Sequence, residues 1–399
     1  MRILLLNEVA AFTGGEMNYY VTDVATRLAA TGDTVALVHG RVPRSEYRGT
    51  GYLFDHLRRM GASREEVRVR LEAILDDFAP EVIQIHGVPN LALDAWLARR
   101  APTLRWVHNH QLYCSGQRMT WAWPRRVCTR EHGPGCLAAH LTRGCGSPNP
   151  ADNLVRYRQV SRSLAHLRTL PGIQVASRMM ADNLIHNGID PARIRYTPLY
   201  APAPEATVRP PQRPFILHAG GLVRQKGVWL MLRLLQRLDP AVDIVFAGGS
   251  GPLETPLREA VARQGLSKRV RIVGEVSLAQ WSRLFSQASL VAVPSLWNEP
   301  LGLAGLYAMA HGKPVVAFRC AGINEWLEDG VTGVAVPFGQ QATFIEATAR
   351  LLENPARCEQ LGARALEHWK ARFRPEHHLE ALRNTYRHAL ETASEGKKA

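Results

Sequence analysis

The chain has 399 residues, of which 46% are hydrophobic and 21% are charged, and this predicts a folded protein with two domains of roughly 200 residues each. The net charge of +14 could indicate an anionic partner, but only six of the 49 basic residues are lysine, which favours a diffuse basic surface. No finger, RNP-like strand or basic zipper is present, so we expect no nucleic-acid partner, and no apolar run reaches the roughly 18 residues of a membrane span. We therefore predict a cytoplasmic protein, with peripheral contact at the inner face of the cell membrane as an open alternative.

Short β-rich runs alternate with amphipathic helical patterns in the first half of the chain. We predict helices at 16–30 and 65–78 and strands at 2–6, 34–38, 81–85, 103–107 and 173–176. This alternation indicates βαβ units and a parallel sheet covered on both faces. The fold class is therefore α/β, and residues 1–200 are interpreted as a first Rossmann-like domain.

Two segments of this first domain follow strands, where parallel sheets place ligands. Gly14 and Gly15 lie between the first strand and its helix, but they lack the G-x-G-x-x-G spacing, so hydride transfer with a nicotinamide loses support. The run HNHQLYC follows the strand at 103–107 and places His108 at the carboxyl end of that strand. His108 could orient a substrate hydroxyl group, and a structural histidine is the alternative.

A cysteine-rich excursion at about 114–145 interrupts the alternation. Its four cysteines are Cys114, Cys128, Cys136 and Cys145. The spacing lacks C-x-x-C pairs, so a structural zinc site and plain thiols are both open in a reducing cytosol. The same segment carries five arginines and two tryptophans but one acid, a composition that could hold an anionic or lipid-linked acceptor or form a lid.

The pattern pauses at a proline-rich stretch and then starts again. Residues 197–214 contain six prolines, and we interpret 201–214 as an interdomain linker. A second domain at 215–375 follows, with strands predicted at 215–219, 243–248, 269–274, 290–294, 314–318 and 333–336. Two doubly wound domains would then face each other across a cleft, and the helix and tail at 376–399 could cross back to the first domain.

Two helix starts in the second domain carry candidate binding residues. Lys226 follows a glycine turn and precedes a helix that begins near Val228, a placement that suggests a diphosphate contact; a solvated turn lysine is the alternative. Glu299 precedes a helix opened by Gly302 and Leu303. A carboxylate cannot bind phosphate, so Glu299 would accept hydrogen bonds from sugar hydroxyl groups, or only stabilise the helix dipole.

Taken together, these segments resemble the retaining nucleotide-sugar glycosyltransferases of family 4, which have two Rossmann-like domains in the GT-B fold. The resembling stretches are AGGLVRQKG (219–227), VFAGGSGP (245–252), RIVGEV (271–276), ASLVAVPSLWNEPLGL (288–303), AMAHGKPVVA (308–317) and AGINEWLEDGVTGVAVP (321–337). The resemblance implies transfer of a sugar, with retention, from a nucleoside diphosphate to a glycan, lipid-linked or small-molecule acceptor, without a catalytic metal. The product would be a surface polysaccharide, glycolipid or glycosylated metabolite.

The resemblance also implies roles for individual residues. His108 and Glu299 would lie beside the reacting donor sugar, and Lys226 would contact the diphosphate. The remaining expected contacts are the cleft loop of Gly14 and Gly15, the donor-side residues Gly220, Gly302 and Leu303, and Glu325 in the family's GG-x-x-E segment.

Two positions depart from the family pattern. Gly221 stands where the family has an arginine, although Arg224 lies close in sequence and could replace it. Tyr307 stands where the second acid of the E-x7-E motif grips the nucleotide ribose. These departures motivate an alternative, a glycosyltransferase-like binding subunit without full activity. A sugar-nucleotide epimerase is a third hypothesis, but it would need acids and a histidine placed for proton abstraction, and the sequence shows no such set.

Overall fold

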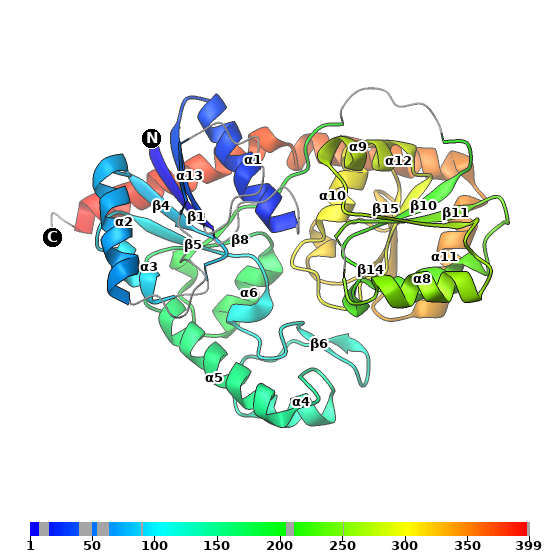
Figure 1. The fold of residues 1–399 in the computed structure, drawn as a ribbon, viewed down its shortest axis with the longest axis horizontal. Coiled ribbons are helices and arrows are strands. Elements are labelled where there is room, and N and C mark those ends of the chain that lie inside the picture. The colour runs from blue at the N-terminus through cyan, green and yellow to red at the C-terminus, as the bar shows by residue number, and fades with distance from the viewer. Residues whose placement is uncertain are drawn as a thin grey trace.

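The computed structural model of the chain describes residues 1–7, 16–39, 50–53, 64–88, 91–204, 211–249 and 251–396. It contains two large parallel β-sheets, one in each half of the chain, with helices packed around both (Figure 1). The predicted α/β fold class with two Rossmann-like domains is therefore confirmed.

The first sheet has seven strands in the order β3-β2-β1-β4-β5-β8-β9. Their bounds are β1 (Arg2–Asn7), β2 (Thr34–His39), β3 (Thr50–Leu53), β4 (Val82–Ile85), β5 (Thr103–Val107), β8 (Ile173–Val175) and β9 (Ile194–Tyr196). Residues 3–6 of β1 are all fully buried, as expected for a central parallel strand covered on both faces. The edge strands β3 and β9 were not predicted, because each is short and lacks a continuous apolar run.

Helices and one small hairpin complete the first domain. The helices are α1 (Glu16–Ala30), α2 (Arg64–Phe78), α3 (Ala92–Leu97), α4 (Gly135–Thr142), α5 (Pro150–Leu167) and α6 (Arg178–His186). Helix α1 buries Val21, Val24, Ala25 and Leu28 at helical spacing. The cysteine-rich excursion contains α4 and an antiparallel pair, β6 (Thr120–Trp121) with β7 (Arg126–Val127).

The second sheet has six strands in the order β12-β11-β10-β13-β14-β15. Their bounds are β10 (Phe215–Ala219), β11 (Asp243–Ala247), β12 (Val270–Gly274), β13 (Leu290–Val293), β14 (Val315–Arg319) and β15 (Gly333–Pro337). The accompanying helices are α7 (Val228–Leu235), α8 (Glu254–Arg263), α9 (Leu278–Gln287), α10 (Leu303–Ala310), α11 (Gln341–Leu352) and α12 (Pro355–Arg372). The strand order changes direction between β10 and β13, which is where open α/β sheets bind ligands.

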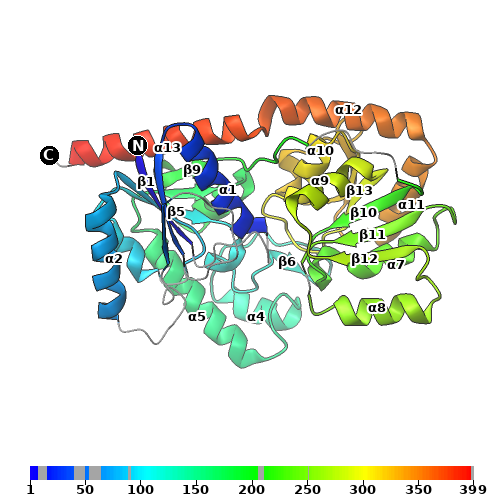
Figure 2. The ribbon, with the colours of Figure 1, turned by 45° about the horizontal axis from the view of Figure 1, so that its top comes forward.

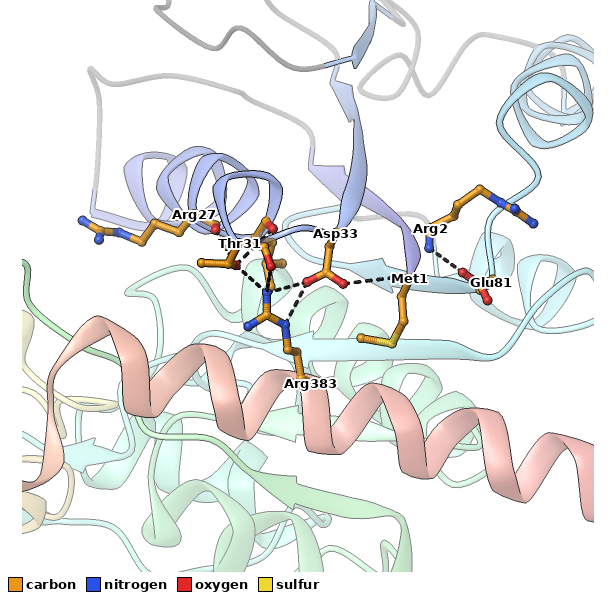
Figure 3. Close-up of polar contacts among 8 residues, drawn as sticks. Met1, Arg2, Arg27, Thr31, Asp33, Glu81 and Arg383 are labelled. Atoms are coloured by element: carbon orange, nitrogen blue, oxygen red, sulfur yellow. Dashed lines mark hydrogen bonds and ion pairs between the residues drawn. The ribbon is translucent and has the colours of Figure 1, made fainter.

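The last helix returns from the second domain and packs on the first. Helix α13 (Pro375–Gly396) continues the line of α12 and contacts α1 and β4 (Figure 2). Arg383 Nε donates to Asp33 Oδ2 at 2.8 Å, while the amino group of Met1 donates to Asp33 Oδ1 at 3.1 Å (Figure 3). Because Asp33 is largely buried, these contacts fix α13 to the first sheet.

Candidate active site

A lysine and a glutamate from two loops of the second domain form a buried ion pair. Lys226 ends the short turn η3 (Arg224–Lys226) after β10, and Glu299 lies in the loop between β13 and α10. Lys226 Nζ donates to Glu299 Oε1 at 2.8 Å, and Ser295 Oγ donates to the same oxygen at 2.5 Å. Glu299 is only 2% exposed, so both contacts act away from bulk water.

These contacts decide the charge of the Glu299 carboxyl. Burial by itself raises the pKa of Glu299, but the positive charge of Lys226 and the hydrogen bonds from Lys226 and Ser295 outweigh it, so the pKa falls below its usual value. The carboxyl is therefore ionised at neutral pH and can only accept hydrogen bonds. The ammonium of Lys226 also lies 5.6 Å from the ring centroid of Trp297, within the range of a cation–π contact.

Glycines allow the two loops to approach each other. Gly227, which precedes α7, has a φ of 70°, and a Cβ there would lie 2.1 Å from the carbonyl oxygen of Pro294. Gly302, which precedes α10, has a φ of 83°, and a Cβ there would lie 2.6 Å from Ile323 Cδ1. Both positions favour glycine by backbone conformation, and at Gly227 the close backbone oxygen also leaves no space for a Cβ.

The arrangement places opposite binding preferences side by side. The ammonium of Lys226 and the N-terminal ends of α7 and α10, where the helix dipole is positive, favour a negatively charged group. The Glu299 carboxylate repels such a group and accepts hydrogen bonds from hydroxyl groups. Both residues line a small cavity of about 10 Å³ together with His218, Ser295 and Gly302.

The other donor-side residues of the second domain lie at different distances from this pair. A Cβ on Gly220, with a φ of 144°, would lie 3.6 Å from Lys226 Cδ, so the backbone of Gly220 runs beside the lysine. Gly221 follows it, and the side chain of Arg224 is exposed to solvent. Leu303 is the first residue of α10 and is half-buried.

Tyr307 lies one turn further along α10 and packs away from the cavity. Its ring stacks on that of Phe285 in α9, with the centroids 5.5 Å apart and the planes at 21°. Among the residues that the structure describes, the lining of the cavity does not include Tyr307. The phenol therefore contributes to helix packing, and its place at the nucleotide ribose stays a prediction.

His108 makes its contacts within the first domain. His108 Nε2 lies 2.9 Å from His86 Nδ1, and its ring stacks at 5.5 Å on that of Trp106. Burial lowers the pKa of His108 to about 3, so its imidazole is neutral at physiological pH. Gly14 and Gly15, the predicted cleft loop, lie outside the residues that the structure describes.

Two residues that the sequence analysis missed join the domains next to Glu299. His110 Nε2 hydrogen-bonds the carbonyl oxygen of Asn298, the residue before Glu299, and both side chains are buried. The second histidine of the HNH run was the available signal for His110. No local pattern indicates that a loop of one domain will meet a particular carbonyl of the other.

Glu325 also connects the two domains. It lies in the short turn η4 (Ile323–Glu325), and its Oε1 accepts a hydrogen bond from the backbone N of Arg178, at the start of α6, at 2.6 Å. Its Oε2 accepts from the Tyr196 hydroxyl at 3.1 Å. A carboxylate at the first turn of α6 is stabilised by the helix dipole, so Glu325 favours contact between the domains.

The four cysteines of the excursion line one cavity of about 20 Å³, together with Tyr113, Trp121, His132 and His140. Burial raises the pKa of the Cys114 thiol, and it raises that of the Cys145 thiol to about 11. All four are free thiols. Within the described ranges, no group of three or more His, Cys, Asp or Glu side chains is arranged to hold a metal ion, so zinc at these thiols stays a prediction.

Two Rossmann-like domains, with the last helix α13 returning from the second to pack on the first, have the GT-B architecture, and comparison with solved structures agrees with this. The sucrose-phosphate synthase of Thermosynechococcus elongatus superimposes with a TM-score of 0.72 at 20% identity and covers 98% of this chain and 99% of that chain. HepE of Anabaena, solved in complex with UDP and glucose, gives a TM-score of 0.72 at 17% identity and covers 96% and 99%. These likenesses show the fold.

Sequence relatives define the family. The model of the family described as glycosyl transferases group 1 matches residues 202–368. A D-inositol 3-phosphate glycosyltransferase of Mycolicibacterium paratuberculosis is 31% identical over 306 residues, which cover 71% of this chain and 67% of that protein. The alpha-D-kanosaminyltransferase of Streptomyces kanamyceticus is 33% identical over 156 residues, but the match spans only 38% of this chain and 40% of that protein. The chain therefore belongs to the group 1 glycosyl transferases.

Membership of this family favours an enzyme over the binding subunit that Gly221 and Tyr307 had suggested.

Among the described helices, none has the length and apolar character needed to cross a bilayer.

Proposed function

We propose that this glycosyltransferase transfers a sugar from a nucleoside diphosphate sugar to a hydroxyl acceptor with retention of the anomeric configuration. The observation that carries the proposal is the ion pair before the N-terminus of α10, in which Lys226 Nζ lies 2.8 Å from Glu299 Oε1. A nucleoside diphosphate sugar has the two kinds of group that this site separates, an anionic diphosphate and neutral hydroxyl groups. The solved complex of HepE with UDP and glucose supports a donor of this chemical class.

In this proposal Lys226 contacts the diphosphate and Glu299 accepts hydrogen bonds from the donor sugar. The departing diphosphate gains negative charge as the glycosidic bond breaks, and the lysine and the N-termini of α7 and α10 stabilise that charge. Glu299 is ionised and already bonded to Ser295, so it positions the sugar and does not supply a proton. Catalysis then consists mainly of positioning and electrostatic stabilisation.

In this proposal the donor displaces Lys226 from Glu299, because in the structure the ammonium and the carboxylate occupy each other at 2.8 Å. Each partner of the ion pair then exchanges the other for a donor group: the lysine contacts phosphate oxygens and the carboxylate contacts hydroxyl groups. In the proposal Arg224, which is exposed two residues before Lys226, takes over the positive charge that the family arginine would supply at Gly221.

His108 completes the proposed site from the first domain. Its neutral imidazole can exchange hydrogen bonds with a sugar hydroxyl group, and the neighbouring His86 at 2.9 Å orients the ring. His86 Nδ1 and His108 Nε2 share one hydrogen between them, which leaves the Nδ1 side of His108 for the substrate.

The acceptor side of the proposal rests on the cysteine-rich excursion. Trp123 is 77% exposed and Leu141 is 66% exposed, and the same excursion carries the exposed arginines Arg125, Arg126 and Arg143. Aromatic and cationic side chains together suit the interface of an anionic membrane, where a lipid-linked acceptor would lie. A cytoplasmic enzyme that works on such an acceptor at the inner membrane face fits this surface.

The test is turnover with a panel of UDP-, GDP-, ADP- and dTDP-hexoses, measured as release of the nucleoside diphosphate, with the product anomer assigned by NMR. We expect one donor class to be consumed and the product to keep the donor's configuration. Lys226→Ala and Glu299→Ala should abolish transfer, whereas Lys268→Ala, which removes an exposed lysine of the same domain, should not. Full activity in either site variant, or an inverted product, would contradict the proposal.

A further inference from the structure

Asn298 is held by contacts from both domains, and it directly precedes Glu299. Its backbone N donates to the carbonyl oxygen of Arg118 at 3.1 Å, and its side-chain Oδ1 accepts from the backbone N of Ala321 at 3.0 Å. Its Nδ2 lies 3.5 Å from Met179 Sδ. Arg118 and Met179 belong to the first domain, so the residue before the candidate sugar-binding carboxylate is fixed largely from across the domain interface.

The fourth contact of Asn298 comes from His110. This residue opens the turn η1 (His110–Leu112), just after β5, and its imidazole is fully buried. His110 Nε2 hydrogen-bonds the Asn298 carbonyl oxygen, and His110 Nδ1 lies 2.6 Å from the Tyr113 hydroxyl. Both ring nitrogens are therefore occupied by protein groups, and neither is directed at a substrate.

The chemistry of the partners fixes the proton on the His110 ring. Burial lowers the pKa of His110 to about 4, so the ring is neutral at physiological pH and carries one proton. A carbonyl oxygen can only accept, so that proton is on Nε2. Nδ1 is then an acceptor, and the Tyr113 hydroxyl donates to it. The Asn298 carbonyl thus sets the tautomer, and the Tyr113 hydroxyl is compatible with it because it can donate to Nδ1.

The position of the Asn298 carbonyl bears directly on Glu299. The peptide group between them is planar, so the carbonyl oxygen of Asn298 and the Cα of Glu299 belong to one rigid unit. A hydrogen bond that fixes this oxygen therefore restricts the rotation of the plane and the place of the Glu299 Cα. Because the donor of the hydrogen bond belongs to the other domain, this restraint exists only while the domains are in contact.

We propose that His110 is a positioning residue, which couples contact between the two domains to the placement of the Glu299 carboxylate. This inference rests on the proposed function, in which Glu299 holds the donor sugar. In this account the histidine does not touch the donor. It aligns the residue that does, and only when the first domain is in place, so that the donor sugar is held for reaction while the two domains are in contact.

The test compares His110→Phe, which removes both ring hydrogen bonds, with His110→Gln, whose side-chain amide can still donate toward the Asn298 carbonyl. In His110→Phe we expect kcat at saturating substrates to fall on the order of 100-fold, the loss typical of a small misplacement of a catalytic group. The affinity for the nucleoside diphosphate alone should change less than about twofold, since Lys226 is untouched. His110→Gln should recover most of kcat. His377→Phe, which replaces an exposed imidazole of α13, is the matched control.

Hydrogen exchange gives a readout that does not need activity. The amide of Asn298 should exchange about fivefold faster in His110→Phe than in the parent or in His110→Gln, because its bond to Arg118 weakens with the loss of the neighbouring restraint. A folded His110→Phe protein with parental kcat and parental exchange would overturn the proposal, and so would equal losses in the Phe and Gln variants. If His110→Phe does not fold, Tyr113→Phe replaces it, with the same expectation and a smaller loss. If the parent transfers no sugar, the proposed function fails, and the exchange result still decides the positioning role.

Discussion

Replacing Lys226 by methionine leaves a buried carboxylate without its cation, and the consequence can be worked out from the structure. Glu299 is 2% exposed, and the Lys226 side chain retains 19% exposure, so the pair is buried on the carboxylate side. Removing one partner of a buried ion pair costs about 3–5 kcal/mol of folding free energy. Because the Ser295 hydroxyl still donates to Glu299 at 2.5 Å, we expect a value near the lower end, about 3 kcal/mol at pH 7.

The cost should depend on pH with a defined sign. In the parent, the pKa of Glu299 lies below its usual value, so the stability that this group contributes is present at neutral pH and is lost as the pH falls. Without Lys226, burial dominates and raises the folded-state pKa of Glu299 above the unfolded value. The variant then loses stability as the pH rises through that pKa. The difference between parent and variant should therefore grow steadily from pH 4 to pH 7.

Urea unfolding followed by tryptophan fluorescence at pH 4.5, 5.5 and 7 measures this difference. The double variant Lys226→Met/Glu299→Gln is the control, because it removes both charges and should recover much of the loss at pH 7. A difference below about 1 kcal/mol, typical of an exposed pair, or a difference that does not vary with pH would refute the account of a buried, ionised Glu299.

Three further outcomes are expected. Tyr307→Glu should tighten binding of the nucleotide donor about fivefold in calorimetry, because a carboxylate adds acceptors for the ribose hydroxyl groups that a phenol lacks. Gly227→Ala should destabilise the chain by roughly 3 kcal/mol in thermal or urea unfolding, because its Cβ would lie 2.1 Å from the Pro294 oxygen; Gly265→Ala, with a similar φ of 66° and open space, should cost only about 1 kcal/mol. Burial lowers the pKa to about 3 or 4 in four histidines, His108, His110, His218 and His378. The free energy of unfolding should therefore fall as the pH drops from 6.5 toward 4, by up to about 3 kcal/mol for each of these buried histidines.

Each of these outcomes has a clear opposite. Unchanged or weaker donor binding in Tyr307→Glu would place the ribose away from α10. Equal costs for the two glycine variants would show that the close approach to Pro294 is not needed. The histidines of the unfolded chain bind protons below pH 6.5, whereas the buried histidines of the folded chain bind them only below about pH 4. A free energy of unfolding that does not change between these pH values would therefore mean that the rings are not buried.

The fold could be predicted from the sequence because its strands are locally encoded. FILHA and LVAVP are mostly apolar runs that end at a glycine and at a proline, and they became β10 and β13 almost residue by residue. The edge strand β9 escaped prediction because its three residues, Ile194–Tyr196, carry an arginine and follow a proline turn. Its place in the sheet depends on pairing with β8, which only the folded chain provides.

The candidate site was predictable only in part, for a related reason. Lys226 and Glu299 stand at helix starts, where sequence alone indicates binding chemistry, and the structure brings them to 2.8 Å across 73 residues of chain. The partnership of His110 with Asn298 spans 188 residues and two domains, and no periodicity or turn signal encodes it. The four cysteines line one cavity, and the sequence did not predict this because their spacing fits no compact motif. Their proximity depends on the fold of the excursion.

Calorimetry with the parent and Glu299→Gln tests whether Glu299 binds the donor sugar, using the nucleotide sugar selected by the turnover panel and its nucleoside diphosphate. We expect the parent to bind both ligands. Glu299→Gln should bind the sugar nucleotide at least about tenfold more weakly, because it loses a charge-assisted hydrogen bond, and it should keep the parental affinity for the nucleoside diphosphate. Absence of binding to the parent, or equal affinity of both proteins for the sugar nucleotide, would contradict the assignment of Glu299 to the donor sugar.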